Sequence, residues 1–463
     1  MTQPLYALSA QDLLTQYAQG ALSPVEVTRA VLDRIAQWEP HVQATYALDA
    51  DAALAQARAS EARWRAKAPQ GRLDGVPVTL KENIRTRGVP TPMGSAATVL
   101  SPSPDDAPAA ARLREAGAVI VSKTTMPDFG FLPAAASSFH PLTRNPWDLS
   151  RNTGGSSSGA GAAVAAGYGP LHLGTDIGGS VRIPAAFCGA VGLKPSQGRV
   201  PVDPPANARC IGPLTRTVRD AALLMREIAQ PDARDYLSLP SADLPWLNLD
   251  LSVKGLRIGL WTDPGAAWSV DEPVLQAVLA AARVFEQAGA IVEPLAEWVA
   301  PEVRQGMTGF FCMRARVELA AMPPERAAKA ARYYQQAAEY AARMTPEDSF
   351  RAFTLCQAMA ESTVKATQPY DFVLSPVSAG LPFAADAIRS DKAHPGRDPH
   401  FTSVFNQSGQ PAVSINCGYS PEGLPIGLQI AGRRFDDVGV LRMARFWEQA
   451  SPVPTRWPEP PAA

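Results

Sequence analysis

The sequence has few of the features that mark a secreted scaffold or a membrane protein. Its five cysteines are odd in number, lie far apart and form no Cys-x-x-Cys pair, which indicates free thiols in a reducing compartment. No apolar run approaches the roughly 18 residues of a transmembrane helix, and the N-terminus lacks the basic and apolar segments of a signal peptide. We therefore expect a cytoplasmic protein that makes no use of a membrane.

An excess of charge of either sign is also missing. The 43 basic and 44 acidic residues leave a formal charge of −1, so no broad electrostatic attraction to nucleic acid is expected. The phosphate-binding pattern GxxxxGK[ST] is absent, as is a GxGxxG pattern followed by an acidic residue. These absences argue against a nucleotide site, and we expect neither a nucleic-acid partner nor a cofactor.

Histidine is scarce, and none of the five histidines has a recognisable catalytic context. No GxSxG motif is present, so a histidine-based triad has little support. His172 lies in the apolar run GPLHLG, which predicts a buried core histidine. His394 and His400 flank a proline-rich loop and make a weak metal signal, and we predict no metal site. The two others are His41 and His140.

What the chain does contain is enough apolar sequence for a large core. It has 463 residues, of which 46% are hydrophobic and 19% charged, as in ordinary globular proteins. Near the N-terminus, Ser23 as N-cap, Pro24 at the first helical position and Glu26 three residues after the cap predict a helix that ends at Pro40. A second helix is expected over about 51–67.

Strand and helix patterns then alternate along the chain. Residues 76–80 have the pattern of a buried strand that ends at Lys81, and a helix with a stop at Gly117 and another apolar strand follow. The same order recurs with a strand at 256–261, a helix at 271–289 and the strand AIVEPL. This alternation predicts an α/β fold with a large central mixed β-sheet flanked by helices on both sides.

The C-terminal half returns to helices and then strands. Residues 313–365 are rich in Ala, Glu, Arg and Gln and predict helices on the outside of the sheet, whereas 371–376 and 411–419 have strand character. Between these strands, the polar and proline-containing stretch 387–400 predicts a surface loop.

No internal repeat and no sharp change of composition divides the chain. We therefore predict a single domain over residues 1–463, with N-terminal helices over about 1–70. The proline-rich segment over about 451–463 is expected to form a frayed tail.

Three short motifs contain residues that can carry chemistry. Two glycines precede Ser180 in GTDIGGSVRIP, which is either ordinary turn material or a site where successive N–H groups converge on a developing negative oxygen. Ser156 lies in RNTGGSSSGAG, where a flexible linker or helix entry is the ordinary interpretation. Lys81 at a strand end is usually a solvated charge, but burial would lower its pKa and provide a base.

In this order, GVPVTLKENI, TGGSSSGAGAAVAAG and GTDIGGSVRIPAAFCGAVGLKP resemble the amidase signature family of serine hydrolases. The resemblance is most specific over a signature core of about 143–200, and weaker similarity extends from about residue 10 to residue 445. It implies a Ser, cis-Ser, Lys triad. In that triad Ser180 is the acylating nucleophile, Ser156 bridges it to the base after a cis peptide bond, and Lys81 is the base.

The resemblance also implies the surroundings of the triad. The N–H groups of an oxyanion hole would come from Ile177, Gly178, Gly179 and Ser180, and side chains at the two glycines would crowd the substrate. Ser157 is expected to support the triad by hydrogen bonding. Asp176 and Arg182 are either a buried ion pair that braces the loop, which the family context favours, or unrelated surface charges.

Two positions depart from the family pattern. Glu82 stands where Asp is frequent, and Ser158 stands where Gly is frequent. Neither belongs to the implied proton path, so the triad assignment does not depend on them.

The resemblance leaves three functions open. The first is a stand-alone amidase that hydrolyses a small-molecule carboxamide to acid plus ammonia or amine, with a homodimer as the assembly that the family suggests. The second is the A subunit of a tRNA-dependent amidotransferase, which hydrolyses glutamine. The third is a non-catalytic binding protein with the same fold. Because residues 296–365 and the segment CIGPLTRT do not resemble the glutamine-binding and docking surfaces of that amidotransferase component, we favour the amidase.

The acyl group is expected to bind among apolar loops and helices near the motifs. The segments chosen by position and apolar content are 126–139, 310–316 and 377–383. Phe129, Phe131 and Phe311 suit an aryl or apolar acyl group, although aromatic residues in such segments are also common in cores.

Overall fold

A computed structural model describes residues 3–265 and 268–461 of the chain. Its centre is an eleven-stranded mixed sheet with the strand order β1-β3-β2-β6-β8-β7-β12-β13-β11-β9-β10. The strands of this sheet are, in chain order, β1 (Thr45–Tyr46), β2 (Pro77–Lys81), β3 (Val119–Thr124), β6 (Leu171–Asp176), β7 (Val191–Lys194), β8 (Cys210–Thr215), β9 (Arg257–Leu260), β10 (Ile291–Pro294), β11 (Phe372–Pro376), β12 (Ala412–Tyr419) and β13 (Pro425–Gly432).

A second, two-stranded sheet is formed by β4 (Arg144–Asn145) and β5 (Asp148–Asn152). Two short 3-10 helices, η1 (Leu5–Ala7) and η2 (Asp128–Gly130), lie among the loops. The α-helices are α1 (Ala10–Gln19), α2 (Pro24–Val42), α3 (Ala50–Arg65), α4 (Pro108–Glu115), α5 (Ser158–Ala166), α6 (Arg182–Cys188), α7 (Val218–Ile228), α8 (Glu272–Gln287), α9 (Pro301–Ala320), α10 (Pro324–Ala327), α11 (Arg332–Ala341), α12 (Pro346–Thr367), α13 (His400–Gln407) and α14 (Asp437–Ala450).

The predicted strand–helix–strand units are confirmed. β2 pairs with β3 in parallel and α4 connects them, and β9 pairs with β10 in parallel through α8. Parallel neighbours need such a crossover connection, so the alternating pattern in the sequence carried this information.

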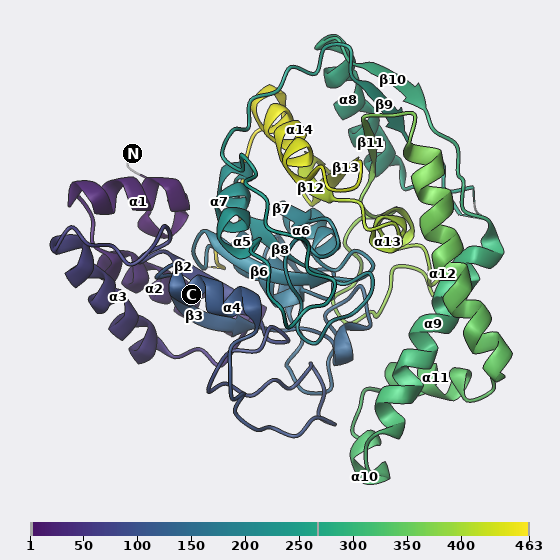
Figure 1. Ribbon diagram of the computed structural model, residues 1–463, viewed down its shortest axis with the longest axis horizontal. Helices are drawn as coiled ribbons and strands as arrows, with labels where there is room; N and C mark the ends of the chain where they lie inside the picture. Colours follow the sequence, from purple (N-terminus) through teal and green to yellow (C-terminus); the bar gives the residue numbers. More distant parts are fainter. Residues whose placement is uncertain (1–2, 266–267, 462–463) are drawn as a thin grey trace.

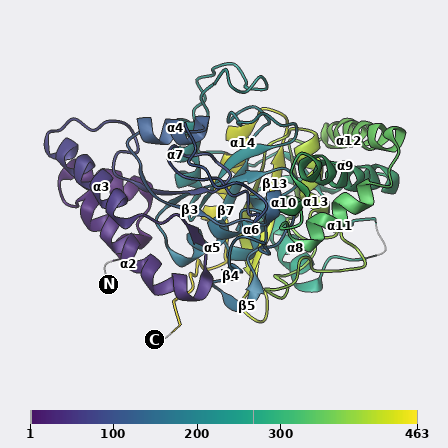
Figure 2. The same cartoon turned by 90° about the horizontal axis from the view of Figure 1, so that it is seen from below.

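Helices cover both faces of the sheet, as the sequence predicts. One cluster of buried apolar residues joins α1, α4, α7, α8 and α14 to the sheet. A second cluster joins α2, α3 and α5 to Val119 and Val121 of β3, whereas Ile120 between them contacts the first cluster. Because side chains alternate along a strand, the two clusters lie on opposite faces. Figures 1 and 2 place α2 and α3 at one end of the molecule and α9, α11 and α12 at the other.

Helix α2 has the predicted start but not the predicted end. The Ser23 hydroxyl accepts from the N–H of Val25, and Glu26 accepts from the N–H of Ser23, which completes the capping box. The expectation that Pro40 ends the helix is wrong, because α2 continues to Val42. So close to the C-terminus, proline removes only one helical hydrogen bond, and Val42 is fully buried.

The helical region after β10 begins earlier than predicted, at Pro301, and contains four helices, α9 to α12. Helix α9 packs closely on α12, since a Cβ atom at Gly306 would overlap the Leu355 side chain. All five cysteines are free thiols, as predicted. Within residues 3–265 and 268–461, no helix combines the length and apolarity needed to cross a bilayer.

Candidate active site

A cavity of about 360 Å³ lies beside the loop that follows β6. Ser180 forms part of its wall and is 8% exposed. Most lining residues are apolar, aromatic or small. They are Gly130, Phe131, Leu132, Pro133, Gly155, Ile177, Gly178, Ser180, Ile183, Met307, Thr308, Phe311, Cys312, Tyr333, Gln336, Ala337, Tyr340, Arg389, Pro395, Gly396 and Pro399.

Lys81 is the last residue of β2 and is fully buried. Its Nζ lies 2.8 Å from Ser156 Oγ, 3.1 Å from Ser157 Oγ and 3.0 Å from Thr175 Oγ1. Strand β2 pairs with β6, so the sheet itself brings Lys81 next to Thr175. The sequence reasoning did not single out Thr175, because a threonine in an apolar strand looks like ordinary strand sequence.

The environment of Lys81 weakens its hold on a proton. Burial lowers the pKa of Lys81 from its ordinary 10.5 to about 7, although the negative charges of Asp176 and Glu82 act in the opposite direction. All three atoms that contact Nζ belong to hydroxyl groups. A lysine with this pKa is present in both its protonated and its neutral form near neutral pH.

The other hydrogen bonds of the hydroxyl groups around Lys81 indicate which hydroxyl can donate a proton to its amine. Ser157 Oγ donates its own proton to the Thr175 carbonyl oxygen, so it can only accept from Nζ. Thr175 Oγ1 accepts from Asn83 Nδ2 and from Nζ. The protonated amine donates to Ser156 Oγ as well, whereas a neutral amine has two N–H groups for the two other acceptors and a lone pair that can accept from Ser156 Oγ.

Ser156 follows a cis peptide bond to Gly155, as the resemblance implies. Gly155 has no room for a side chain, because a Cβ atom there would lie 2.5 Å from the backbone N of Ala134. The next residue, Ser157, donates its backbone N–H to the carbonyl oxygen of Ser180 at 3.1 Å. The two serine motifs, which are separate in the sequence, are thus joined directly by a main-chain hydrogen bond.

The N–H groups of the loop from Ile177 to Ser180 differ in whether they already have a hydrogen-bond acceptor within the protein. The N–H of Gly179 donates to Asp176 Oδ1 at 2.7 Å, so the expectation that Gly179 belongs to the oxyanion hole does not fit the structure. The N–H groups of Ile177, Gly178 and Ser180 donate to no other described residue, and all three residues line the cavity.

The two glycines also differ in what surrounds them. A Cβ atom at Gly178 would meet nothing within 4 Å, so this position borders open space. A Cβ atom at Gly179 would collide with Thr402 and lie 2.8 Å from Ile183 Cδ1, and the residue has φ +131°. Gly179 is therefore required by packing and backbone conformation, and not by the approach of a substrate as the sequence reasoning assumed.

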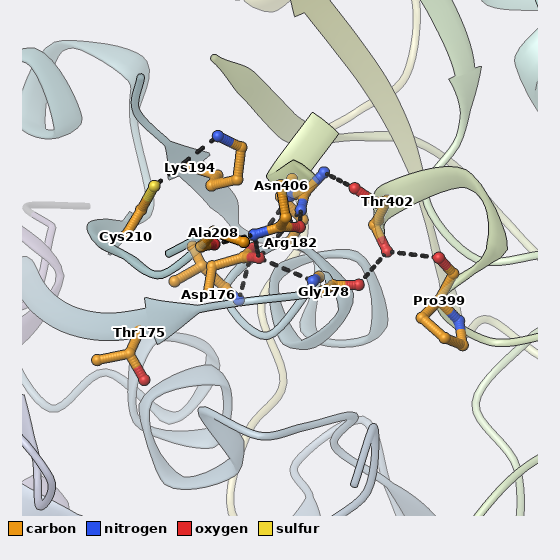
Figure 3. A network of polar contacts seen from close by, with 12 residues as sticks. Thr175, Asp176, Gly178, Arg182, Lys194, Ala208, Cys210, Pro399, Thr402 and Asn406 are labelled. Atoms are coloured by element: carbon orange, nitrogen blue, oxygen red, sulfur yellow. Dashed lines mark hydrogen bonds and ion pairs between the residues drawn. The ribbon is translucent and has the colours of Figure 1, made fainter. Parts of the chain in front are cut away.

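Asp176 and Arg182 form the buried ion pair that the family context favours, with both side chains at 0% exposure. Arg182 also donates to the Thr402 carbonyl oxygen at 2.9 Å and to Asn406 Oδ1 at 2.5 Å on α13. Thr402 Oγ1 in turn donates to the carbonyl oxygen of Gly178 at 2.6 Å (Figure 3). Burial alone would raise the pKa of Asp176, but the Arg182 charge and hydrogen bonds hold that pKa well below its usual range.

The two residues that depart from the family pattern make their hydrogen bonds outside this network. Glu82 accepts from the N–H of Gly94 and lies 3.3 Å from His140 Nε2. Ser158 Oγ donates to the carbonyl oxygen of Ala134 at 3.4 Å.

The segments expected to form the acyl pocket are only partly confirmed. Residues 130–133 from the first segment and Phe311 with Cys312 from the second line the cavity. The segment 377–383 does not contribute to the lining, and Phe129 instead stacks on Tyr334 with a centroid distance of 4.6 Å. The prediction was wrong there because apolar content does not distinguish a cavity wall from a packed interior.

Two parts of the wall were missed by sequence reasoning. Helix α11 contributes Tyr333 and Tyr340, whose spacing is that of any amphipathic helix. The loop predicted to lie on the surface contributes Arg389 and Pro399. The prolines and glycine of that segment indicate a loop, but they do not indicate that the loop folds toward the cavity.

His172 is the buried core histidine that the sequence predicts. His172 lies 2.8 Å from Thr79 Oγ1 and 3.0 Å from the Gly169 carbonyl oxygen, and burial lowers its pKa to about 3. His394 contacts Asp391, whereas His400 contacts Glu297, so these two do not share a ligand.

The mixed sheet and the buried lysine among serine hydroxyls define an α/β enzyme of the amidase signature type. Residues 26–441 match the Amidase family, and the chain belongs to that family. It is therefore an enzyme that acts on amide C–N bonds.

The similar proteins include both amidotransferase A subunits and acylamidases. The chain is 36% identical to the A subunit of the glutamyl-tRNA(Gln) amidotransferase of Myxococcus xanthus, over 96% of this chain and 97% of the relative. It is 33% identical to an acylamidase of Rhodococcus erythropolis, with 97% of each chain covered. The solved structure of a bacterial aryl acylamidase superposes with a TM-score of 0.89 at 28% identity and covers 97% of each chain. The sequence comparison thus supports the amidotransferase alternative at least as well as the stand-alone amidase.

Proposed function

We propose that this enzyme is an amidase for small carboxamides with an apolar or aryl acyl group, and that Ser180, Ser156 and Lys81 form its triad. The observation that carries the proposal is the 2.8 Å contact between Nζ of a buried lysine and Ser156 Oγ, next to a cavity whose wall contains Ser180. A lysine with a pKa near 7 can act as a general base at neutral pH.

In the proposed reaction, Ser180 Oγ bonds to the carbonyl carbon and its proton passes through Ser156 to neutral Lys81. The carbonyl oxygen becomes negative and accepts hydrogen bonds from the N–H groups of Ile177, Gly178 and Ser180. The proton then returns to the amine, which leaves as the C–N bond breaks. Water attacks the acyl-enzyme by the same proton route and releases the acid.

Three residues are proposed to hold this arrangement without touching the substrate. Ser157 positions Lys81 and the backbone of Ser180, with which it shares hydrogen bonds. Asp176 and Arg182 fix the loop from both ends, because Asp176 accepts from the N–H of Gly179 and Arg182 reaches α13.

The composition of the cavity favours the amidase over a glutaminase. Glutamine carries an α-ammonium group, which needs a carboxylate partner when it leaves water. Within the described part of the chain, no aspartate or glutamate lines the cavity. An acyl group with an aryl or aliphatic body and no ammonium group suits the wall of Phe131, Phe311, Tyr333 and Ile183 better.

We also propose the domain organisation, the partners and the assembly of the enzyme. One sheet that runs from β1 near the N-terminus to β10 supports a single domain over residues 1–463. A small-molecule amide, with no nucleic acid and no membrane, remains the proposed partner, and a homodimer remains a prediction.

The test is ammonia release from acetamide, hexanamide, benzamide, phenylacetamide and glutamine, with Ser180→Ala as the control. We expect turnover of the apolar and aryl amides, little turnover of glutamine, and loss of activity in Ser180→Ala. Glutamine hydrolysis that rises only with the other amidotransferase components and glutamyl-tRNA would establish the alternative. Failure of a fluorophosphonate to add to Ser180, measured by intact mass, would favour a non-catalytic protein.

A further inference from the structure

Among the described residues that line the cavity, Arg389 is the single charged side chain. It comes from the loop between β11 and α13, and its positive charge also acts on Cys312 of α9. Arg389 therefore belongs to the outer wall of the cavity, which α9 and this loop form together. Ser180 belongs to the wall formed by the signature loops.

Three arginines close to the cavity have an acidic partner, whereas Arg389 has none within the described ranges. Arg304 pairs with Glu297 at 2.8 Å, Arg314 with Glu318 at 3.1 Å and Arg397 with Asp271 at 2.5 Å. Arg389 makes no ion pair and no hydrogen bond to any residue in 3–265 or 268–461.

Asp398 is the acidic group whose pKa is influenced by the charge of Arg389, but its carboxylate is engaged elsewhere. It accepts from both the N–H and the hydroxyl of Ser390. The guanidinium thus faces an apolar cavity with its own donors unused.

A half-buried guanidinium with unused donors is a binding group for a carboxylate, which it can hold through two parallel hydrogen bonds. A substrate that enters this cavity can carry such an anion to the guanidinium. No lining residue in 3–265 or 268–461 is acidic, so no carboxylate of the described wall competes with that anion or would neutralise an accompanying ammonium group.

We propose that the preferred acyl group carries a carboxylate at the end remote from the amide, and that Arg389 binds it. The substrates would be monoamides of dicarboxylic acids with an aryl or aliphatic body, and free amino acids such as glutamine would be excluded by their ammonium group. This inference rests on the proposed function, since it assumes that the amide carbonyl is held at Ser180.

The first test compares two substrates of the same shape, 2-(4-carboxyphenyl)acetamide and 2-(4-nitrophenyl)acetamide, at low ionic strength. A hydrogen-bonded ion pair in a partly desolvated site corresponds to a preference of roughly tenfold to a hundredfold in kcat/KM for the carboxylate. We expect this preference in the wild type, carried mainly by KM, and its loss in Arg389→Met. Arg389→Lys should retain part of it.

Lys392→Met is the matched control, because Lys392 is an exposed cation on the same loop and does not line the cavity. It should leave the preference of the wild type unchanged. Equal kcat/KM values for the two substrates in the wild type, or an undiminished preference in Arg389→Met, would overturn the inference. Turnover of the nitro compound in those cases would leave the proposed amidase function standing.

A second test needs no turnover. Ser180→Ala is titrated with 2-(4-carboxyphenyl)acetamide by calorimetry, and the titration is repeated with Ser180→Ala combined with Arg389→Met. We expect a Kd that is roughly tenfold to a hundredfold weaker without the guanidinium. An equal Kd, or no binding to either variant, would refute the role of Arg389 independently of the catalytic assignment.

Discussion

Arg182 holds Asp176 through two parallel hydrogen bonds, from Nε to Oδ2 and from Nη2 to Oδ1, each 3.0 Å long. Both side chains are fully buried, and the Asp176 carboxylate also fixes the N–H of Gly179. The pair therefore ties the start of α6 to the loop that carries Ser180.

Removing one partner of this pair leaves the other as an uncompensated buried charge. We expect Arg182→Met to lower the free energy of unfolding by about 3 to 5 kcal/mol, measured by urea denaturation. Lys365→Met, which breaks an exposed ion pair with Glu361, serves as the control and should leave the midpoint unchanged. A midpoint for Arg182→Met equal to that of the wild type would mean that the pair does not stabilise the fold.

The activity should depend on pH through Lys81. The proposed base is the neutral amine, and its pKa is lowered to about 7 by burial. We therefore expect kcat/KM to rise as the pH increases through about 7 and to level off one to two pH units above it. The profile is measured with phenylacetamide between pH 5 and about 10, and a kcat/KM that still rises steeply above pH 9 would contradict a base with a pKa near 7.

Replacement of Lys81 provides a separate check on the same group. Lys81→Met removes the amine from a fully buried position and should reduce kcat by at least about a hundredfold, as expected for loss of a general base. Circular dichroism establishes whether the variant is folded. A folded variant with wild-type kcat would exclude Lys81 as the base.

Replacing Gly178 with alanine should impair activity, whereas replacing Gly179 with alanine should impair stability. Gly178→Ala meets no atom within 4 Å, so the variant should fold with wild-type stability, and its new methyl group at the cavity should lower kcat/KM. Gly179→Ala collides with Thr402 and requires a φ near +131°, so we expect a loss of about 2 kcal/mol or more in the free energy of unfolding. Thermal and urea unfolding measure the stability of both variants. Equal stability of the two would contradict this distinction between the glycines.

Phe311 should influence which acyl group is accepted. It lines the cavity and contacts Phe131 edge to face at a centroid distance of 6.3 Å. Phe311→Ala should reduce kcat/KM for phenylacetamide by roughly tenfold while changing that for acetamide little, because only the aryl group loses an apolar contact. Phe353→Ala, on α12 outside the cavity, is the control and should not alter this ratio.

The sequence predicted helix and strand boundaries correctly where neighbouring residues alone determine them. The capping box at Ser23 and Glu26 and the strand before Lys81 depend on neighbouring residues alone, and both are present in the structure. Pro40 was misjudged because the burial of Val42 by distant residues outweighs the loss of one helical hydrogen bond.

The site was predictable only where a motif resembled a known family. Lys81 and Ser156 lie 75 positions apart and Ser180 lies further on, so no periodicity connects them. The use of the Gly179 N–H by Asp176 is a local contact between residues three positions apart, which the sequence left open. The turn of Arg389 into the cavity and the contacts of Arg182 with α13 depend instead on how distant segments fold back in space. Such arrangements are set by tertiary contacts with α9 and α13, and residue type alone does not encode them.

The residues proposed for bond breaking and those that surround the acyl group come from different parts of the chain. Lys81, Ser156 and Ser180 belong to β2 and the signature loops, whereas much of the outer wall comes from α9, α11 and the loop containing Arg389. The region from α9 to α12 can therefore diverge without disturbing the proton route. In evolutionary terms, a lineage can acquire new substrates by exchanging this wall, and transplanting residues 301–341 together with 389–399 from a relative is a direct route to an enzyme with altered selectivity.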